Sequence, residues 1–218
     1  MKGYVVTLMN VPESVKVAKR CINSCLKYGL DAELFSAVWR TDSEKELQKE
    51  GLELTFGDER WANPAAVAGN FISQYRIWKK IRDSYQPGIV FEHDAVLIAP
   101  VPNLDGKGDI INLGEPSYGH FRKKNKPGIY PMFSKIGGYI PGAHGYYVTP
   151  NGAQELISKA KQIGAVACDL FLCVKNFPNI KELYPWVIQA HDNFTTIQKE
   201  SGCRAKHNYG KGKKFDII

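Results

Sequence analysis

The chain has 218 residues, of which 44% are hydrophobic and 23% charged, a composition ordinary for one globular domain and unlike that of disordered or fibrous chains. No apolar run approaches the roughly 18 residues that a membrane span requires, and the chain opens with a strand-like segment, so a cytoplasmic protein without a transmembrane segment is expected. The net charge of +7 predicts attraction to anionic partners, and five cysteines without a Cys-x-x-Cys pair indicate reduced thiols.

The first half of the chain predicts a βαβ unit followed by a long helix. The expected elements are a strand at residues 3–8, a helix at 15–26, a strand at 32–38, a short helix or an excursion at 41–51 and a helix from 64 to about 85. Gly29 ends the first helical pattern. Asn63 and Pro64 form a typical helix start, with an N-cap residue before a proline at the first helical position.

The second half of the chain continues the alternation of strands and helices. The expected elements are a strand at 89–91, a strand at 109–113, a long loop at 115–141, a strand at 144–148, a helix at 153–163 and a helical segment at 169–174. The long loop is rich in Gly, Pro and Lys, a composition typical of functional loops. Residues 1–207 are expected to form one α/β domain, and residues 208–218 a basic, weakly ordered tail.

Two carboxylates flank a histidine where the strand at 89–91 is expected to end. In an open α/β sheet the carboxyl ends of the strands line the ligand crevice, so Glu92 and Asp94 are well placed for a bound cation or phosphorylated ligand. Their side chains share one face if the extended conformation continues, whereas His93 would point the other way and be structural. Two such oxygen ligands suit Mg²⁺ or Mn²⁺ bound to a diphosphate. The alternative is a pair of solvated acids in a turn.

Several segments, in order along most of the chain, resemble glycosyltransferase family 25, which contains lipopolysaccharide sugar transferases and collagen galactosyltransferase domains. Residues 69–78 (GNFISQYRIW) resemble the family helix Gly-Cys-x-x-Ser-His-x-x-x-Trp, and residues 90–95 (VFEHDA) resemble its strand ending in Glu-Asp-Asp. Residues 142–153 (GAHGYYVTPNGA) and 168–171 (CDLF) are similar to its later Gly-Thr-x-x-Tyr and Pro-x-Asp segments. The chain departs from the family at Asn70, Gln74 and His93, where the family has Cys, His and Asp.

The resemblance implies a single Rossmann-like fold of the GT-A type, with a mostly parallel central sheet and helices on both faces. Residues 1–207 would then be the glycosyltransferase domain. The implied activity is that of an inverting hexosyltransferase, which moves a hexose from a nucleotide diphosphate sugar, first of all a UDP-sugar, to an acceptor hydroxyl with the help of Mn²⁺ or Mg²⁺. The implied acceptor is a saccharide, as in lipopolysaccharide biosynthesis.

The resemblance and the strand ends together predict the site residues. Asp94 is expected to bind the metal, Glu92 to contact a metal-bound water or the ribose, and His191 to complete the metal shell. Asp169 is expected to be the catalytic base, and its alternative role is to cap a helix dipole. The donor is expected to contact Thr7, Leu8, Met9, Ser36, Val38, Ser73, Gln74 and Glu92.

Two alternatives remain open for function. Basic residues gather at 122–126 and near the end of the chain, so the acceptor could be a hydroxyl-bearing base in nucleic acid, bound through phosphate contacts. The altered positions Gln74 and His93 also allow a catalytically silent module that binds a sugar nucleotide or nucleic acid. The sequence leaves the sugar, the acceptor and the oligomeric state open.

Overall fold

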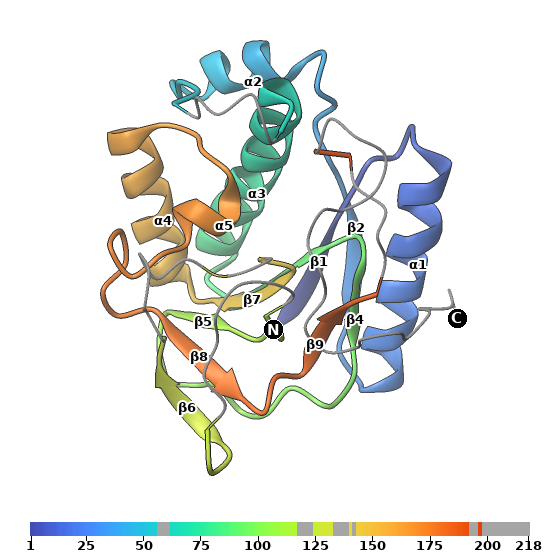
Figure 1. The fold of residues 1–218 in the computed structure, drawn as a ribbon, viewed down its shortest axis with the longest axis vertical. Helices are drawn as coiled ribbons and strands as arrows, with labels where there is room; N and C mark the ends of the chain where they lie inside the picture. The colour runs from blue at the N-terminus through green and yellow to red at the C-terminus, as the bar shows by residue number, and fades with distance from the viewer. Residues whose placement is uncertain (56–61, 117–123, 133–139, 141–142, 192–195, 198–218) are drawn as a thin grey trace.

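A computed structural model of the chain describes residues 1–55, 62–116, 124–132, 140, 143–191 and 196–197, and Figure 1 shows its fold. The helices are α1 (Pro12–Lys27), α2 (Ser43–Lys49), α3 (Pro64–Ser84), α4 (Pro150–Ile163) and α5 (Cys168–Phe171). The strands are β1 (Lys2–Thr7), β2 (Ala32–Ser36), β3 (Gly88–Glu92), β4 (Ala95–Leu97), β5 (Ile110–Asn112), β6 (Gly128–Pro131), β7 (Gly145–Val148), β8 (Lys181–Tyr184) and β9 (Ile188–Ala190).

Within the described residues, the centre of the fold is a mixed seven-stranded sheet with the order β2-β1-β3-β7-β5-β8-β6. Pairings of β1 with β2, β1 with β3 and β5 with β8 are parallel, and those that involve β7 or β6 are antiparallel. Strands β1, β2, β3, β5 and β8 therefore run in one direction, and β6 and β7 run against them. The α/β class and the prevailing parallel direction are confirmed, while the reversal of β7 between β3 and β5 was not foreseen.

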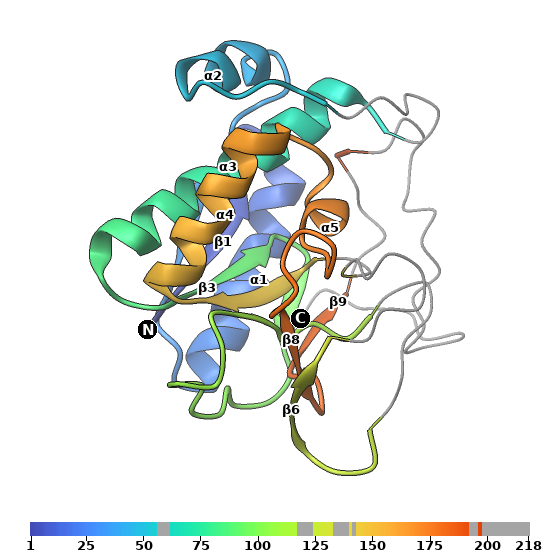
Figure 2. The same ribbon diagram turned by 90° about the vertical axis from the view of Figure 1, so that its left-hand side faces the viewer.

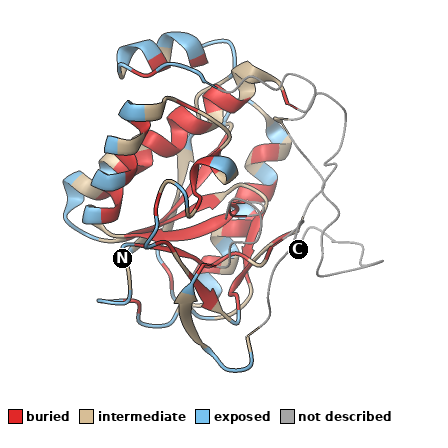
Figure 3. Cartoon of the chain, turned by 60° about the vertical axis from the view of Figure 1, so that its left-hand side comes forward, coloured by how far each residue is buried: buried red, intermediate tan, exposed pale blue. Residues whose placement is uncertain are grey.

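Side chains alternate between two cores, one on each face of the central sheet. Val5, Ile89 and Phe91 face the core that contains the buried residues of α1. Val90 and Tyr146 face the core that contains residues of α3, α4 and α5. Figure 2 shows α3 and α4 side by side over their face of the sheet, and Figure 3 shows the buried strands between helices whose outer surfaces are exposed. The expected helices on both faces are thus confirmed.

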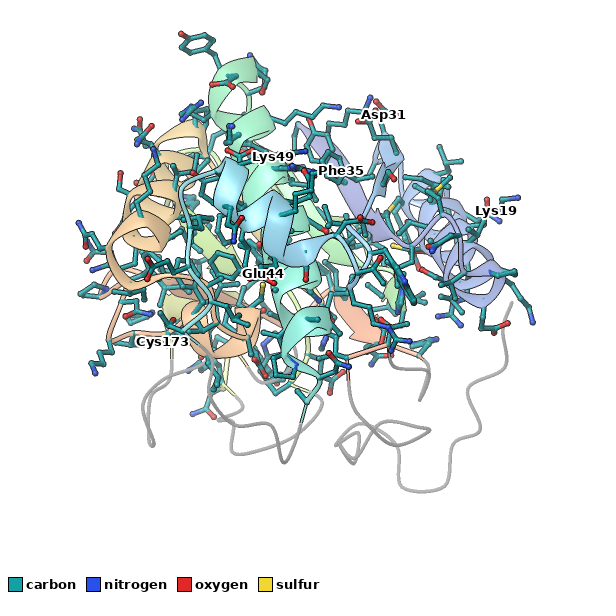
Figure 4. All side chains as sticks on the ribbon, turned by 90° about the horizontal axis from the view of Figure 1, so that it is seen from above. Lys19, Asp31, Phe35, Glu44, Lys49 and Cys173 are labelled. Carbon is teal, nitrogen blue, oxygen red and sulfur yellow. The ribbon has the colours of Figure 1, made fainter. Side chains whose placement is uncertain are left out.

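The starts of α3 and α4 are marked by capping residues. The side chain of Asn63 accepts a hydrogen bond from Ala66 N at the start of α3, and that of Thr149 accepts one from Gly152 N at the start of α4. Helix α2 lies over α3 (Figure 4, with Glu44 and Lys49 labelled), and an ion pair between Lys79 Nζ and Glu50 Oε2 at 2.7 Å joins α3 to the residue that follows α2.

The structure differs from the expected elements mainly after residue 114. Strand β6 lies inside the segment expected to be a loop, and strands β4, β8 and β9 were not predicted. Helix α5 ends at Phe171, earlier than expected. Residues 208–218 lie outside the described residues, so the expected tail stays a prediction. Of the helices that are described, none combines the length and hydropathy that a membrane span requires.

Candidate functional site

The candidate site lies at the edge of the sheet where β1, β2 and β3 end. Ala37 N donates to Thr7 O at 2.8 Å, which joins the segment after β2 to the end of β1. On the other side of β3, Glu92 N donates to His144 O at 3.1 Å, just before β7 begins. Because β7 is antiparallel to β3, its first residues lie beside the carboxyl end of β3. Segments from four neighbouring strands therefore meet around the residues that follow β3.

Glu92 is the last residue of β3, and its side chain faces α3. Asn70 Nδ2 of α3 donates a hydrogen bond to Glu92 Oε1 at 3.3 Å. Burial, followed by the negative charge of Asp94, raises the pKa of Glu92 to about 8. The hydrogen bond from Asn70 opposes this rise, and the charge of Asp169 adds to it. Glu92 therefore binds a proton near neutral pH unless a positive charge lies close by.

Asp94 lies in a turn after β3, so the expected continuation of an extended strand through residues 92–94 does not occur. Its carbonyl oxygen accepts hydrogen bonds from Arg20 Nη2 at 3.2 Å and from His191 N at 3.0 Å. Its negative charge adds to the effect of burial in raising the pKa of both Glu92 and the Cys21 thiol of α1. Asp94 is therefore close enough to Glu92 for the two charges to interact, although strand alternation does not bring them together.

Asp169 reaches the same place from a distant part of the chain. It lies in α5, where its Oδ1 accepts a hydrogen bond from Leu170 N at 3.0 Å. Burial raises the pKa of both Glu92 and Cys168, and the charge of Asp169 contributes to the rise in each. Asp169 is thus near enough to Glu92 and Cys168 for its charge to act on both.

His191 follows β9 and has an imidazole oriented by its neighbours. Gln189 Nε2 donates to Glu115 Oε2 at 2.6 Å, which directs Gln189 Oε1 toward His191 Nε2, 3.1 Å away. Because Gln189 Oε1 can only accept, His191 Nε2 carries the proton, and a neutral His191 ring then has its lone pair on Nδ1. Among the described residues, no group of three or more His, Cys, Asp or Glu side chains could hold a metal ion.

A chain of hydrogen bonds connects Glu92 to the core, and sequence reasoning missed it. Trp78 Nε1 donates to the Tyr146 hydroxyl at 2.8 Å, and that hydroxyl donates to Gln74 Oε1 at 2.7 Å. Gln74 Nε2 donates to Asn70 Oδ1 at 2.7 Å, and Asn70 in turn donates to Glu92. The spacing of Asn70 and Gln74, four residues apart on one helix, was the available signal, because such pairs lie on one helix face. No such signal in the sequence indicated that Tyr146 of β7 would bind Gln74.

The residues expected to contact the donor occupy different environments. Thr7 is fully buried, and its hydroxyl donates to Val5 O. The buried Ser73 hydroxyl accepts from Val38 N at 2.8 Å and donates to Gly69 O at 2.5 Å, so it joins α3 to the segment after β2. Three further candidates line the sheet edge: Leu8 and Val38 are partly exposed, and Ser36 is exposed.

The other two candidates for contact with the donor also differ in exposure. Met9, just after β1, is exposed, whereas Gln74 is fully buried within the hydrogen-bonded chain. Contact between Gln74 and a donor therefore stays a prediction, and the structure connects this residue to the site through Asn70. On the opposite face, His93 Nδ1 lies 2.7 Å from the Ser14 hydroxyl of α1, as expected for a structural residue that points away from Glu92.

Comparison with protein-family models found no match to the chain, and comparison with curated proteins found none either. Solved structures do resemble the fold. One is CTP:phosphocholine cytidylyltransferase from Streptococcus pneumoniae, with a TM-score of 0.40, 14% identity and coverage of 86% of this chain and 91% of that chain. Another is a glycosyltransferase involved in the glycosylation of the major capsid of PBCV-1, with a TM-score of 0.40, 8% identity and coverage of 74% and 68%.

A third similar structure is a Drosophila β1,4-galactosyltransferase 7 mutant in complex with manganese, UDP-Gal and xylobiose. It has a TM-score of 0.43 and 7% identity, with coverage of 96% of this chain and 72% of that chain. Similarity at this level does not distinguish one activity from another, because one fold supports many functions.

Proposed function

We propose that the chain is a glycosyltransferase that moves a hexose from a nucleotide diphosphate sugar, most simply a UDP-sugar, to an acceptor hydroxyl with inversion. The observation that supports this best is that Glu92 and Asp94 lie at the carboxyl end of β3 and that the charges of Asp94 and Asp169 both act on Glu92. In sheets of this kind ligands bind beyond the carboxyl ends of the strands. In this proposal Glu92 and Asp94 form the cation site, and Asp169 is the base.

The electrostatics of the site support a bound cation. Burial and the neighbouring charge of Asp94 raise the pKa of Glu92, so the ionised pair is unfavourable unless a positive charge offsets it. Glu92 and Asp94 offer the oxygen ligands that Mg²⁺ and Mn²⁺ prefer, and Mg²⁺ is often bound by one or two carboxylates together with substrate phosphates. A pair of carboxylates therefore suffices, with His191 as a further candidate. Such a cation would neutralise the charge that grows on the departing diphosphate.

The residues of the chain then perform the remaining steps of the proposed reaction. The acceptor oxygen attacks the anomeric carbon on the face opposite the diphosphate, the new C–O bond forms, and the bond to the diphosphate breaks. Asp169 takes the proton of the acceptor hydroxyl, a role that requires hydrogen-bond reach of that oxygen. Asn70 holds Glu92 beside the diphosphate position, and the segment after β2, which is joined to α3 through Ser73, lies where a nucleotide would bind.

We propose a saccharide as the acceptor in preference to nucleic acid, because one lysine of the basic run is engaged inside the protein. Lys124, from the basic run at 122–126, forms an ion pair with Glu182 at 2.7 Å, and both side chains are largely buried. Lys124 Nζ also lies 5.3 Å from the centre of the Tyr130 ring. This lysine therefore serves an internal contact between β6 and β8, not a phosphate on the surface. Arg122 and Lys123 lie outside the described residues.

Binding and hydrolysis of UDP-sugars test the proposal. We expect UDP to bind more tightly with Mn²⁺ than without it, measured by calorimetry, and Asp94→Asn to remove most of the gain. Asp169→Asn should retain this binding but slow Mn²⁺-dependent hydrolysis of UDP-glucose or UDP-galactose by about 10²- to 10⁴-fold, the usual contribution of a general base.

Asp83→Asn is the matched control, because Asp83 is an exposed carboxylate paired with Arg82 at the end of α3. This variant should bind and hydrolyse as the unmodified protein does. UDP binding that is indifferent to Mn²⁺ and to Asp94→Asn, without hydrolysis, would contradict the proposal and favour a catalytically silent module.

A further inference from the structure

The hydrogen-bonded chain from Trp78 to Glu92 has one direction, which its first member sets. The Trp78 indole N–H can donate but cannot accept, so the Tyr146 oxygen must be its acceptor. The single Tyr146 proton is then directed to Gln74 Oε1. With its oxygen on that side, Gln74 presents its NH₂ group to Asn70 Oδ1, and Asn70 presents its own NH₂ group to Glu92. Each amide orientation follows from the one before it.

We infer that Tyr146, Gln74 and Asn70 are positioning residues, which hold Oε1 of Glu92 so that its other oxygen is presented to the ligand. This inference rests on the proposed function, since it makes Glu92 the residue that is presented. A reversed Gln74 amide would place its oxygen against Asn70 Oδ1, and a reversed Asn70 amide would place its oxygen against Glu92, where it would repel the ionised carboxylate. The orientation of the site carboxylate therefore depends on a hydroxyl that is buried in the core and touches no ligand.

Because this chain of hydrogen bonds is buried, each of its polar groups needs a partner. Trp78, Gln74 and Tyr146 are fully buried, and leaving one of their polar groups without a partner is costly. Apolar residues of similar size could fill the same volume, so packing alone does not require this chain. Cys168 Sγ, 3.6 Å from Asn70 Oδ1, lies at the same amide and adds a weak contact that is compatible with the orientation given.

Tyr146→Phe tests the inference, with Tyr147→Phe as the matched control. Both tyrosines lie in β7 and are buried, but Tyr147 faces the core of α1. In Tyr146→Phe the Gln74 amide can adopt both orientations, so we expect the side-chain NH₂ signals of Asn70 and Gln74 to shift or double in ¹⁵N NMR spectra. UDP binding in the presence of Mn²⁺ should weaken about fivefold or more, which corresponds to roughly 1 kcal/mol, the usual net value of one hydrogen bond. Tyr147→Phe should change neither.

The outcomes separate this inference from the proposed function. Unchanged amide signals in Tyr146→Phe would overturn the directed chain, whatever the protein binds. Changed signals with UDP binding equal to that of Tyr147→Phe would overturn the positioning role. Failure of the unmodified protein to bind UDP with Mn²⁺ would instead remove the proposed function and the presentation of Glu92 to that ligand, while the amide signals would still decide the chain. The melting temperatures of both variants show whether unfolding accounts for a loss of binding.

Discussion

Glu92 combines two environments that oppose each other. Burial and the charge of Asp94 disfavour its ionised form, while the Asn70 amide stabilises that form through a hydrogen bond. A residue placed in this way makes the protein less stable than a neutral side chain would, unless a ligand brings positive charge. Such a cost is expected at a binding site, because binding sites are selected for function at the expense of stability.

Glu92→Gln should therefore stabilise the protein without ligand, and more so at high pH. The pKa of Glu92 is raised to about 8 in the folded chain from 4.5. Between these values the folded chain holds a proton that the unfolded chain has lost, so stability falls as pH rises and the loss is complete above pH 8. We expect the melting temperature of Glu92→Gln to exceed that of the unmodified protein by about 2–4 °C at pH 9, which is near 1 kcal/mol for a chain of this size, and by little at pH 4.5.

Glu33→Gln provides a control of opposite sign. Hydrogen bonds from Lys2 and then Lys80 lower the pKa of Glu33, so its charge favours the folded state above pH 4.5. The contribution of Glu33 to stability is small because its ion pairs with Lys2 and Lys80 are partly exposed.

A melting temperature of Glu92→Gln that stays equal to that of the unmodified protein from pH 5 to 9 would show that Glu92 is not held in a destabilising environment.

At the scale of elements, the site depends on the close approach of α3 to the segment after β2. A Cβ atom added at Gly69 would lie 2.6 Å from Val38 O, so the helix reaches the backbone only because residue 69 is glycine. One turn further along α3, the Ser73 hydroxyl accepts a hydrogen bond from Val38 N. Together these contacts hold the segment after β2 against α3, while its hydrogen bond to Thr7 O keeps it beside the end of β1.

Gly69→Ala should separate α3 from this segment and lower both stability and UDP binding. We expect a loss of about 1–3 kcal/mol in the free energy of unfolding, the usual cost of overpacking, measured by urea denaturation. Ser73→Ala should cost a similar amount, because the Val38 N–H loses its acceptor. The control is Ser158→Ala on the exposed surface of α4, which should have little effect. Gly69→Ala with unchanged stability would mean that α3 does not pack this closely.

At the scale of the whole molecule, some of the lysines are held in ion pairs with carboxylates. Lys79 is paired with Glu50, Lys80 with Glu33, and Lys124 with Glu182. A nucleic-acid surface requires lysines and arginines that are available to phosphates. In the described part of the chain these three lysines are paired with carboxylates, so their charge contributes little to a phosphate-binding surface.

We therefore expect only non-specific binding to duplex DNA. In a filter-binding or fluorescence anisotropy titration at 150 mM salt, the dissociation constant should be about 10⁻⁵ M or weaker, within the usual range of non-specific binding. Lys124→Gln should not weaken it further. DNA binding tighter than about 10⁻⁷ M with a steep dependence on salt would instead indicate a nucleic-acid acceptor.

Local patterns in the sequence predicted most of the regular elements. Helix α3 begins at Pro64 after the predicted cap Asn63, and α4 begins at Pro150, three residues before the expected start. Short strands late in the chain were missed, since β8 and β9 have four and three residues and their pairing is with distant partners. Short apolar runs have too few periods to be recognised, whereas long amphipathic helices carry several.

The candidate site, too, was predictable from the sequence only in its local part. The sequence by itself determined that two carboxylates follow a buried strand, because strand ends are marked by an abrupt change from apolar to charged residues. Tertiary structure alone decided that the charge of Asp169 acts on Glu92, that Asp94 lies in a turn by Arg20 and His191, and that Tyr146 donates to the amide behind Asn70 and Glu92. Those contacts join segments far apart in the chain, and the burial and charge that set the pKa of Glu92 exist only once the segments have packed together.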